Sequence, residues 1–203
     1  MRQHRLSRQH ILVKSAVFEA APRDTRDILV RLSYLPRMTA AMAEAATGNP
    51  DAGKLLAGLA RRHLFTDRRF GTDTTYQFHA LFRAFLKERA REQLGVAEHQ
   101  RLSHSVAALL QATGQSEDAL ELYLEGAAWD SAARLIVQET ESLVRQGRRE
   151  SLRRWIEALP LEFVNRDPDL LYALGLSHFQ ANPEAVESAR RMLSRAYDGY
   201  VKA

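Results

Sequence analysis

One short segment, residues 75–86, changes its hydrophobic period half-way and so constrains the fold on both sides of it. Tyr76 and Phe78 alternate with polar residues, which is the period of a half-buried strand. From there on the apolar residues follow helical spacing and form a single stripe of Phe78, Leu81, Phe82, Phe85 and Leu86. His79 stands at the corner between the two patterns. We therefore predict a strand that leads directly into a helix.

Short helices, separated by turn and capping signals, precede this corner. The predicted helical ranges are 7–20, 24–35, 40–47 and 52–63. Thr39 and Asp51 are the expected caps of the last two helices. An alternating segment at 64–68 and a polar turn at 70–74 then lead to the strand at 75–78. Three or four helices followed by a two-stranded wing are the plan of a winged helix, and we assign residues 1–95 to that domain.

Beyond residue 95 the pattern changes to consecutive amphipathic helices. The predicted ranges are 98–113, 117–126, 129–144, 150–159, a helix opened by Asp167-Pro168, and a helix from Pro183 to about residue 200. Pairs of helices begin near residues 98, 131 and 168, at about the 34-residue spacing of tetratricopeptide (TPR) repeats. The predicted fold class is mainly α: a winged helix followed by TPR-like α-hairpin repeats, an α-solenoid, over residues 96–203.

The last predicted repeat helix reaches almost to Ala203. No polar capping helix follows it, although a solenoid usually needs one to cover the apolar face of its final repeat. We therefore expect a fragment, a broken reading frame, or an open end that meets a partner.

The composition excludes several classes of protein. The chain has no cysteine, which excludes disulfides, thiolate catalysis and cysteine-based metal sites, and its histidines show no metal-binding spacing. The net charge of +4, from 29 basic and 25 acidic residues, is a mild excess that a solvated surface explains. No apolar run reaches the roughly 18 residues needed to cross a membrane. We expect a cytoplasmic protein that does not bind membranes.

The corner segment also carries a family resemblance. The pattern Tyr-x-x-His-x-Leu-Phe-x-x-Phe-Leu at residues 76–86 resembles the end of the winged helix in STAND-type signalling ATPases, above all the MalT-like, LuxR-type bacterial transcription activators. Similar landmarks lie at residues 27–35, 117–129 and 152–160. In that family a nucleotide-binding domain precedes the winged helix, and a helical-repeat sensor and a DNA-binding helix-turn-helix follow it. The resemblance implies that this chain carries the middle of that plan only.

The resemblance gives His79 a role as a nucleotide sensor that reaches the phosphates of bound ADP or ATP, with Arg83 one turn further on. A helix N-terminus favours an anion, so the position suits that role. The alternative is a corner histidine that only caps the wing and the helix. Because the main nucleotide cradle is missing, we expect no cofactor on the chain alone and ADP or ATP only when a nucleotide-binding domain is present, in cis or in trans.

A second pattern imitates a phosphate-binding loop. Residues 48–54 fit G-x-x-x-x-G-K, but Leu55 stands where the loop needs a magnesium-binding Ser or Thr. A helix rather than a strand precedes it, and Asp51 would bring negative charge close to the phosphates. We interpret the segment as a helix stop followed by a helix start. The chain has no other catalytic pattern, and we expect it not to be an enzyme.

Three functions remain open at this stage. The first is a regulatory and sensor module that couples nucleotide state to an unknown inducer or protein bound by the repeats. The second is a free-standing TPR-like adaptor for protein interaction. The third is a small winged-helix DNA-binding protein. The helix at 52–63 exposes mainly Lys54, Arg61 and Arg62 and has no Asn or Gln to read adenine, so we do not expect direct, specific DNA binding.

Overall fold

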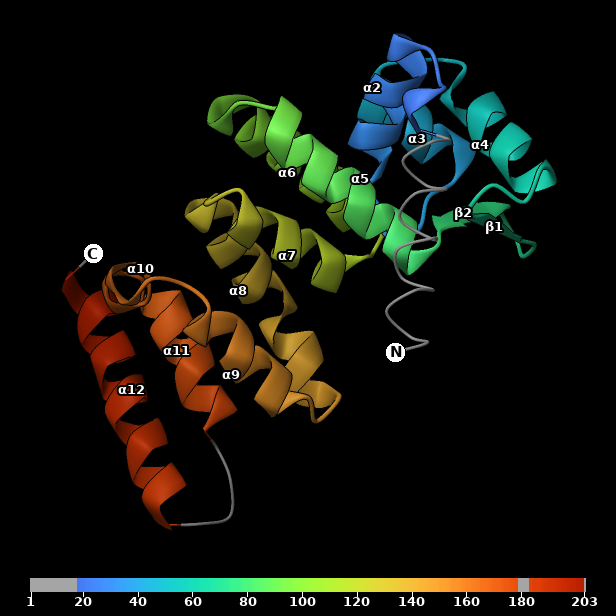
Figure 1. The fold of residues 1–203 in the computed structure, drawn as a ribbon. Coiled ribbons are helices and arrows are strands. Elements are labelled where there is room, and N and C mark those ends of the chain that lie inside the picture. The colour runs from blue at the N-terminus through green and yellow to red at the C-terminus, as the bar shows by residue number, and fades with distance from the viewer. Residues whose placement is uncertain (1–17, 179–182, 203) are drawn as a thin grey trace, which may run out of the picture. The chain divides into compact units, whose positions relative to one another are not determined.

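The computed structural model describes residues 18–178 and 183–202, and the described chain divides into two compact units between Thr113 and Gly114. The first unit contains α2 (Arg23–Leu32), α3 (Ala40–Thr47), α4 (Ala52–Arg61), β1 (Thr66–Arg69), β2 (Thr75–Phe78), α5 (Ala80–Gln93) and α6 (Val96–Ala112) (Figure 1). The second contains α7 (Ser116–Glu125), α8 (Trp129–Arg145), α9 (Arg149–Glu157), α10 (Leu161–Arg166), α11 (Pro168–Ser177) and α12 (Pro183–Lys202). The mainly helical fold class, with a winged helix followed by helical repeats, is confirmed.

The first unit differs from the predicted domain in its extent. Most of the helix predicted at 7–20 lies outside the described residues. Helix α6, which the sequence assigns to the repeats, packs on α3 and belongs to the first unit. Two polar contacts hold its first turn: Arg31 donates to Glu98 at 3.0 Å, and the Tyr34 hydroxyl bonds His99 Nδ1 at 2.7 Å. The sequence pattern could not indicate these contacts, because about 65 residues separate the partners.

Helices α3 and α4 show one capping prediction confirmed and one wrong. The Thr39 hydroxyl accepts from the Met42 amide at 3.2 Å, and Gly48 ends α3 at a φ of 69°. Asp51, by contrast, makes no capping bond to α4. Its carboxylate accepts from Lys54 at 2.8 Å instead, since a charged donor one turn away competes with the backbone amides.

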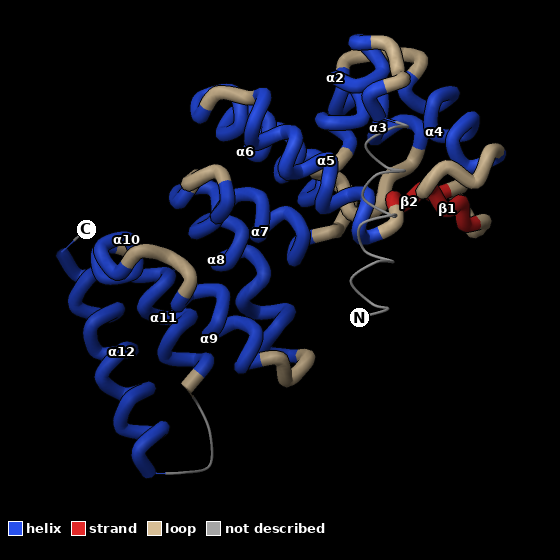
Figure 2. The backbone as a smooth tube through the Cα atoms, viewed as in Figure 1, coloured by secondary structure: helices blue, strands red, loops and turns tan. Residues whose placement is uncertain are grey.

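The wing is an antiparallel pair in which Thr66 faces Phe78 and Arg69 faces Thr75 (Figure 2). Met38 forms a separate, isolated bridge to β2, because it exchanges two backbone hydrogen bonds with Tyr76. The first strand begins two residues later than the predicted 64–68, since Phe65 has a φ of 51° and turns the chain there. The second strand has the predicted bounds.

An aromatic cluster joins the wing to α5. The Phe82 ring lies 5.5 Å from Phe78, 5.2 Å from Phe65 and 6.4 Å from Phe85, measured between ring centroids. The predicted apolar stripe is wrong at Leu81, whose side chain is 66% exposed. The buried face repeats every fourth residue instead: Phe78, Phe82, Leu86 and Ala90.

The second unit consists of helices packed on their neighbours in sequence and on the next pair. Helix α8 packs on α7, α9 and α11, and α11 packs on α12. The five helices predicted in this part of the chain are confirmed, and Asp167 caps α11 by accepting from the amides of Asp169 and Leu170. Helix α10 is not among the predicted elements. Its six residues between two prolines are too few to show a helical period.

Gly53 in α4 sits against α3 where no side chain fits. A Cβ atom there would lie 2.7 Å from Ala40 Cβ and 2.9 Å from a Glu44 carboxylate oxygen. Gly58, one and a half turns further along α4, meets only the end of the Arg62 side chain, at 4.0 Å. The two glycines therefore differ in packing while sharing one helix.

We expect Gly53→Ala to destabilise the chain by roughly 1–3 kcal/mol, because the added methyl group overlaps α3. Gly58→Ala should instead stabilise it by about 0.5–1 kcal/mol, because alanine is the better helix former and the site is open. Urea unfolding followed by circular dichroism measures both. Equal effects of the two substitutions would contradict the close packing of α3 on α4.

Candidate functional site at the corner between the wing and helix α5

Backbone hydrogen bonds on both sides fix the position of His79. Its amide donates to the Phe65 carbonyl at 2.8 Å, which ties the corner to the chain entering the wing. Its own carbonyl accepts from the amides of Phe82 and Arg83, both at 2.9 Å, and so starts α5. The residue is therefore the N-cap of α5, although its side chain makes no capping bond.

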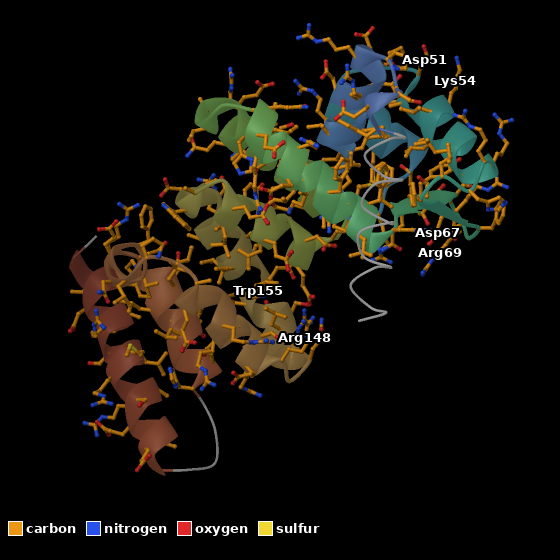
Figure 3. The ribbon with its side chains drawn as sticks, viewed as in Figure 1. Asp51, Lys54, Asp67, Arg69, Arg148 and Trp155 are labelled. Carbon is orange, nitrogen blue, oxygen red and sulfur yellow. The ribbon has the colours of Figure 1, made fainter. Side chains whose placement is uncertain are left out.

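The imidazole of His79 points to the wing rather than to the helix end. Its Nε2 lies 3.2 Å from Oδ1 of Asp67, a residue of β1 (Figure 3), and the two side chains are 49% and 60% exposed. The ring meets Phe65 edge-on with centroids 6.2 Å apart. A neutral ring that donates from Nε2 to Asp67 keeps only a lone pair at Nδ1. To donate to an anion as well, the ring must take up a second proton or release Asp67.

Arg83 points to a different element. Its Nε donates to the Ser33 carbonyl at 2.8 Å, and a terminal nitrogen donates to the Tyr34 carbonyl at 3.3 Å. Ser33 is the C-cap of α2, where a cation is favoured by the free carbonyls and the helix dipole. The structure thus brings His79 to the wing and Arg83 to the end of α2, and Arg83 would have to leave two carbonyls to reach a phosphate.

The phosphate-loop lookalike at residues 48–54 has the geometry of two packed helix ends. Asp51 and Lys54 form an exposed ion pair at 2.8 Å at the start of α4 (Figure 3). The hydrogen bond to Asp51 raises the pKa of Lys54. The second glycine of the motif serves the contact with α3. The prediction of a helix stop followed by a helix start is confirmed, with Asp51 pairing rather than capping.

Adjacent arginines occur at residues 61–62, 68–69, 148–149 and 153–154, and several of their side chains bind within the chain. Arg62 donates to the Gly58 carbonyl at 3.3 Å, and Arg68 covers the exposed ring of Phe70 at 4.4 Å. In the second unit Arg148 pairs with Glu117, and Glu150 pairs with Arg153. The first two contacts occupy the guanidinium groups without changing their charge, whereas the two ion pairs offset charge in the second unit.

Each unit also has a hollow on its own surface. In the first unit a hollow of 710 Å³ is lined by Arg23, Arg26, Asp27, Val30, Arg31, Gln93, Leu94 and Glu98. Its charges are largely paired, since Arg31 bonds Glu98 and Arg26 bonds Glu19 at 3.2 Å. In the second unit a hollow of 440 Å³ lies on α8, α11 and the end of α12.

Neither a metal site nor a membrane span emerges from the described residues. Within residues 18–178 and 183–202, no three His, Cys, Asp or Glu side chains are grouped so that they could hold a metal ion. Over the same residues, every helix is too short or too polar to cross a bilayer.

Comparison with known proteins agrees with the winged-helix fold of the first unit. The MalT winged helix domain matches residues 14–98, and the wing and corner lie within that range. The described part of that range, residues 18–98, is similar to this domain and is called a MalT-type winged helix. Over 154 residues, 76% of its length, the chain is 27% identical to the HTH-type transcriptional regulator MalT of Yersinia pestis (strain Pestoides F). It is 26% identical to the protein of the same name from Yersinia enterocolitica serotype O:8 / biotype 1B (strain NCTC 13174 / 8081). The chain spans 17% of the length of these curated relatives, and it is similar to part of a MalT-like regulator.

Sequence reasoning missed Asp67 as a member of this site in the MalT-type winged helix. The only available signal was the wing register, because an antiparallel pair places Asp67 opposite Gln77, two residues before the histidine. That register depends on the residue at which β1 starts, and the turn at Phe65 sets this start. With the predicted start at residue 64, the register does not show which side chain of β1 faces His79.

His79 and Arg83 should differ in their effect on the stability of the MalT-type winged helix. Arg83→Met removes two hydrogen bonds from a charged donor and should cost about 1.5–3 kcal/mol. His79→Ala removes one exposed contact and should cost less than about 1 kcal/mol. Thermal and urea unfolding of both variants checks this, with Arg91→Met as the control, since Arg91 pairs with Glu88 and both side chains are mostly exposed. A larger cost for His79→Ala than for Arg83→Met would contradict the assignment of Arg83 as the structural residue.

Proposed function

We propose that the chain is a non-catalytic regulatory and sensor region of a STAND-type, MalT-like transcription regulator of the LuxR family. The winged helix packs on a nucleotide-binding domain, in cis or in trans, and responds to its nucleotide through His79. The helical unit, built of TPR-like repeats, binds an inducer or a partner protein. One observation carries the proposal: a half-exposed imidazole at the N-terminus of α5, held by its backbone at the strand-to-helix corner of a MalT-type winged helix.

The electrostatics of the corner support an anionic ligand. The first amides of a helix have no partner within the helix, and the N-terminal end carries partial positive charge. A β-phosphate oxygen next to the corner would meet these amides and the imidazole N–H together. Bound there, the nucleotide would hold the winged helix against the nucleotide-binding domain in a closed, inactive arrangement.

Exposed apolar surface at the same corner supports the docking step. Leu81, in the first turn of α5, is 66% exposed although it follows a half-buried strand. A nucleotide-binding domain that covers Leu81 would bury it next to His79. Domain docking and nucleotide sensing would then occur at one place.

The contact with Asp67 gives His79 an alternative to the nucleotide contact. The Asp67 carboxylate bonds His79 when no phosphate is present, and a phosphate would compete with it for the same imidazole. A neutral imidazole has a single N–H donor, so unless the ring takes up a second proton, the pair and the nucleotide contact exclude each other. Nucleotide binding would shift the population between the two arrangements according to its preference for one of them.

We do not assign sequence-specific DNA reading to this chain. Helix α4, which precedes the wing, presents Lys54 in an ion pair with Asp51, and Arg62 bonds its own helix. Phosphate contacts alone carry no sequence information. In the proposed plan a separate helix-turn-helix domain binds the DNA, and the protein acts in the cytoplasm.

In a complete regulator that contains this region, His79→Ala should release ADP roughly twofold to tenfold faster, the range expected for one lost hydrogen bond. Transcription without inducer should rise, because the closed state is less populated. ADP retention after gel filtration and a reporter assay measure the two effects. Unchanged retention together with unchanged basal transcription would contradict the proposal.

Two further variants make this test specific. Lys54→Met changes the lysine of the phosphate-loop lookalike, which lies in an ion pair at the start of α4, and should retain ADP like the unmodified protein. Asp67→Asn removes the competing carboxylate while keeping the size of the side chain. It should retain ADP more strongly, in the opposite direction to His79→Ala. Faster release from Asp67→Asn would show that the pair supports the nucleotide-bound state rather than competing with it.

A further inference from the structure

The hollow on the second unit combines aromatic rings, carboxylates and an apolar floor. Two half-exposed tyrosines line it, Tyr172 of α11 at 46% and Tyr200 of α12 at 49% exposure. The remaining lining is Val137, Thr140, Glu141, Val144 and Arg145 of α8, with Asp169 and Leu176 of α11. Its volume of 440 Å³ is within the usual range for small-molecule sites.

The polar groups of the hollow are arranged around Asp169. The Tyr200 hydroxyl donates to Asp169 Oδ1 at 2.5 Å, which leaves the carboxylate with further capacity to accept. This bond, with help from burial and from the charge of Asp167, raises the pKa of Tyr200 to about 12. Tyr200 therefore stays a neutral hydroxyl at physiological pH, and the negative charge stays on Asp169.

The other charged side chains that line the hollow neutralise each other, and its threonine hydroxyl already donates a hydrogen bond. Arg145 lies 3.8 Å from Glu141, and both side chains are largely exposed, so this pair has no net charge to offer. The Thr140 hydroxyl donates to the Ile136 carbonyl at 2.8 Å within its own helix. Asp169 is thus the carboxylate whose charge remains uncompensated by a cation in the hollow.

We infer that this hollow binds an alkylammonium group, with the cation between Asp169 and the two tyrosines and the alkyl chain on Val137, Val144 and Leu176. Tyrosine rings attract cations electrostatically, and a nearby carboxylate adds direct charge attraction. The branched apolar side chains can cover the methylene groups of the ligand. Either a free organic amine or the side chain of a lysine in a partner peptide has this chemistry.

The inference goes beyond the proposed function. Binding needs only the helical unit, so it holds or fails independently of nucleotide sensing at His79. Only a role of the amine as an inducer would rest on the regulatory proposal. A measurement on this chain without nucleotide therefore separates the two.

The probe is hexylammonium chloride, titrated into the 203-residue chain by isothermal calorimetry, with hexanoate and hexanol at equal concentration as matched ligands. We expect hexylammonium to bind and the other two to bind at least tenfold more weakly. The second arm uses a peptide that is acetylated at its N-terminus and contains an unmodified lysine side chain. Tighter binding of the peptide assigns the site to a partner chain, whereas tighter binding of the amine assigns it to a small molecule.

Variants locate the site and test the sign of the charge that it attracts. Tyr172→Leu should weaken hexylammonium binding roughly threefold to tenfold, the loss of one cation–π contact at a partly exposed site. Asp169→Asn should weaken it and Arg145→Gln should strengthen it, because they change the charge in opposite directions. Tyr197→Leu is the control, since Tyr197 lies on the same helix as Tyr200, is 68% exposed, and does not line the hollow.

Three results would overturn the inference: no heat of binding with either the amine or the peptide, equal binding of hexylammonium and hexanoate, or equal loss of binding in Tyr172→Leu and Tyr197→Leu. Tyr172 and Tyr197 are both exposed enough for the variants to fold, and circular dichroism checks this.

Discussion

The packing of Phe82 is the contact on which the winged helix depends most. This buried ring meets Phe65 before β1, Phe78 at the end of β2 and Phe85 on its own helix. It therefore joins the turn before β1, the end of β2 and α5, in a wing of only four-residue strands. Because two short strands are not stable alone in water, the wing exists only while α5 supports it.

The same packing determines how the corner presents His79. Phe82 packs in the aromatic cluster, and Arg83 bonds the carbonyls at the end of α2. These two contacts fix the position of the first turn of α5. The backbone of His79 is consequently fixed while its imidazole stays half-exposed. A rigid backbone with an accessible side chain is the arrangement that a sensing residue needs, since little order is lost when a ligand binds. The structural role of Arg83 and the sensing role proposed for His79 are thus complementary.

Local signals in the sequence predicted most elements, and contacts between distant segments decided the rest. Thr39 and Asp167 were recognisable as caps because the amides they bond lie within three residues. Leu81 looked buried by period alone, but the stripe of α5 turns toward α2 and leaves it outside. The Asp67–His79 pair and the Tyr34–His99 bond join residues 12 and 65 positions apart, and no local pattern encodes such distances. His79 is therefore recognisable as a candidate residue from the sequence, whereas its partner Asp67 is recognisable only from the fold.

The magnitudes indicate what would drive the proposed nucleotide response. Exchange of the exposed Asp67 pair for a phosphate contact replaces one interaction of roughly 0.2–1 kcal/mol with another of similar kind. A hundredfold shift between two states needs about 2.7 kcal/mol of differential affinity. Burial of a leucine side chain on docking contributes about 1.5–3 kcal/mol, and most of the Leu81 side chain is available for it. Domain docking at Leu81 would then supply most of the energy, and His79 would determine which nucleotide permits the docking.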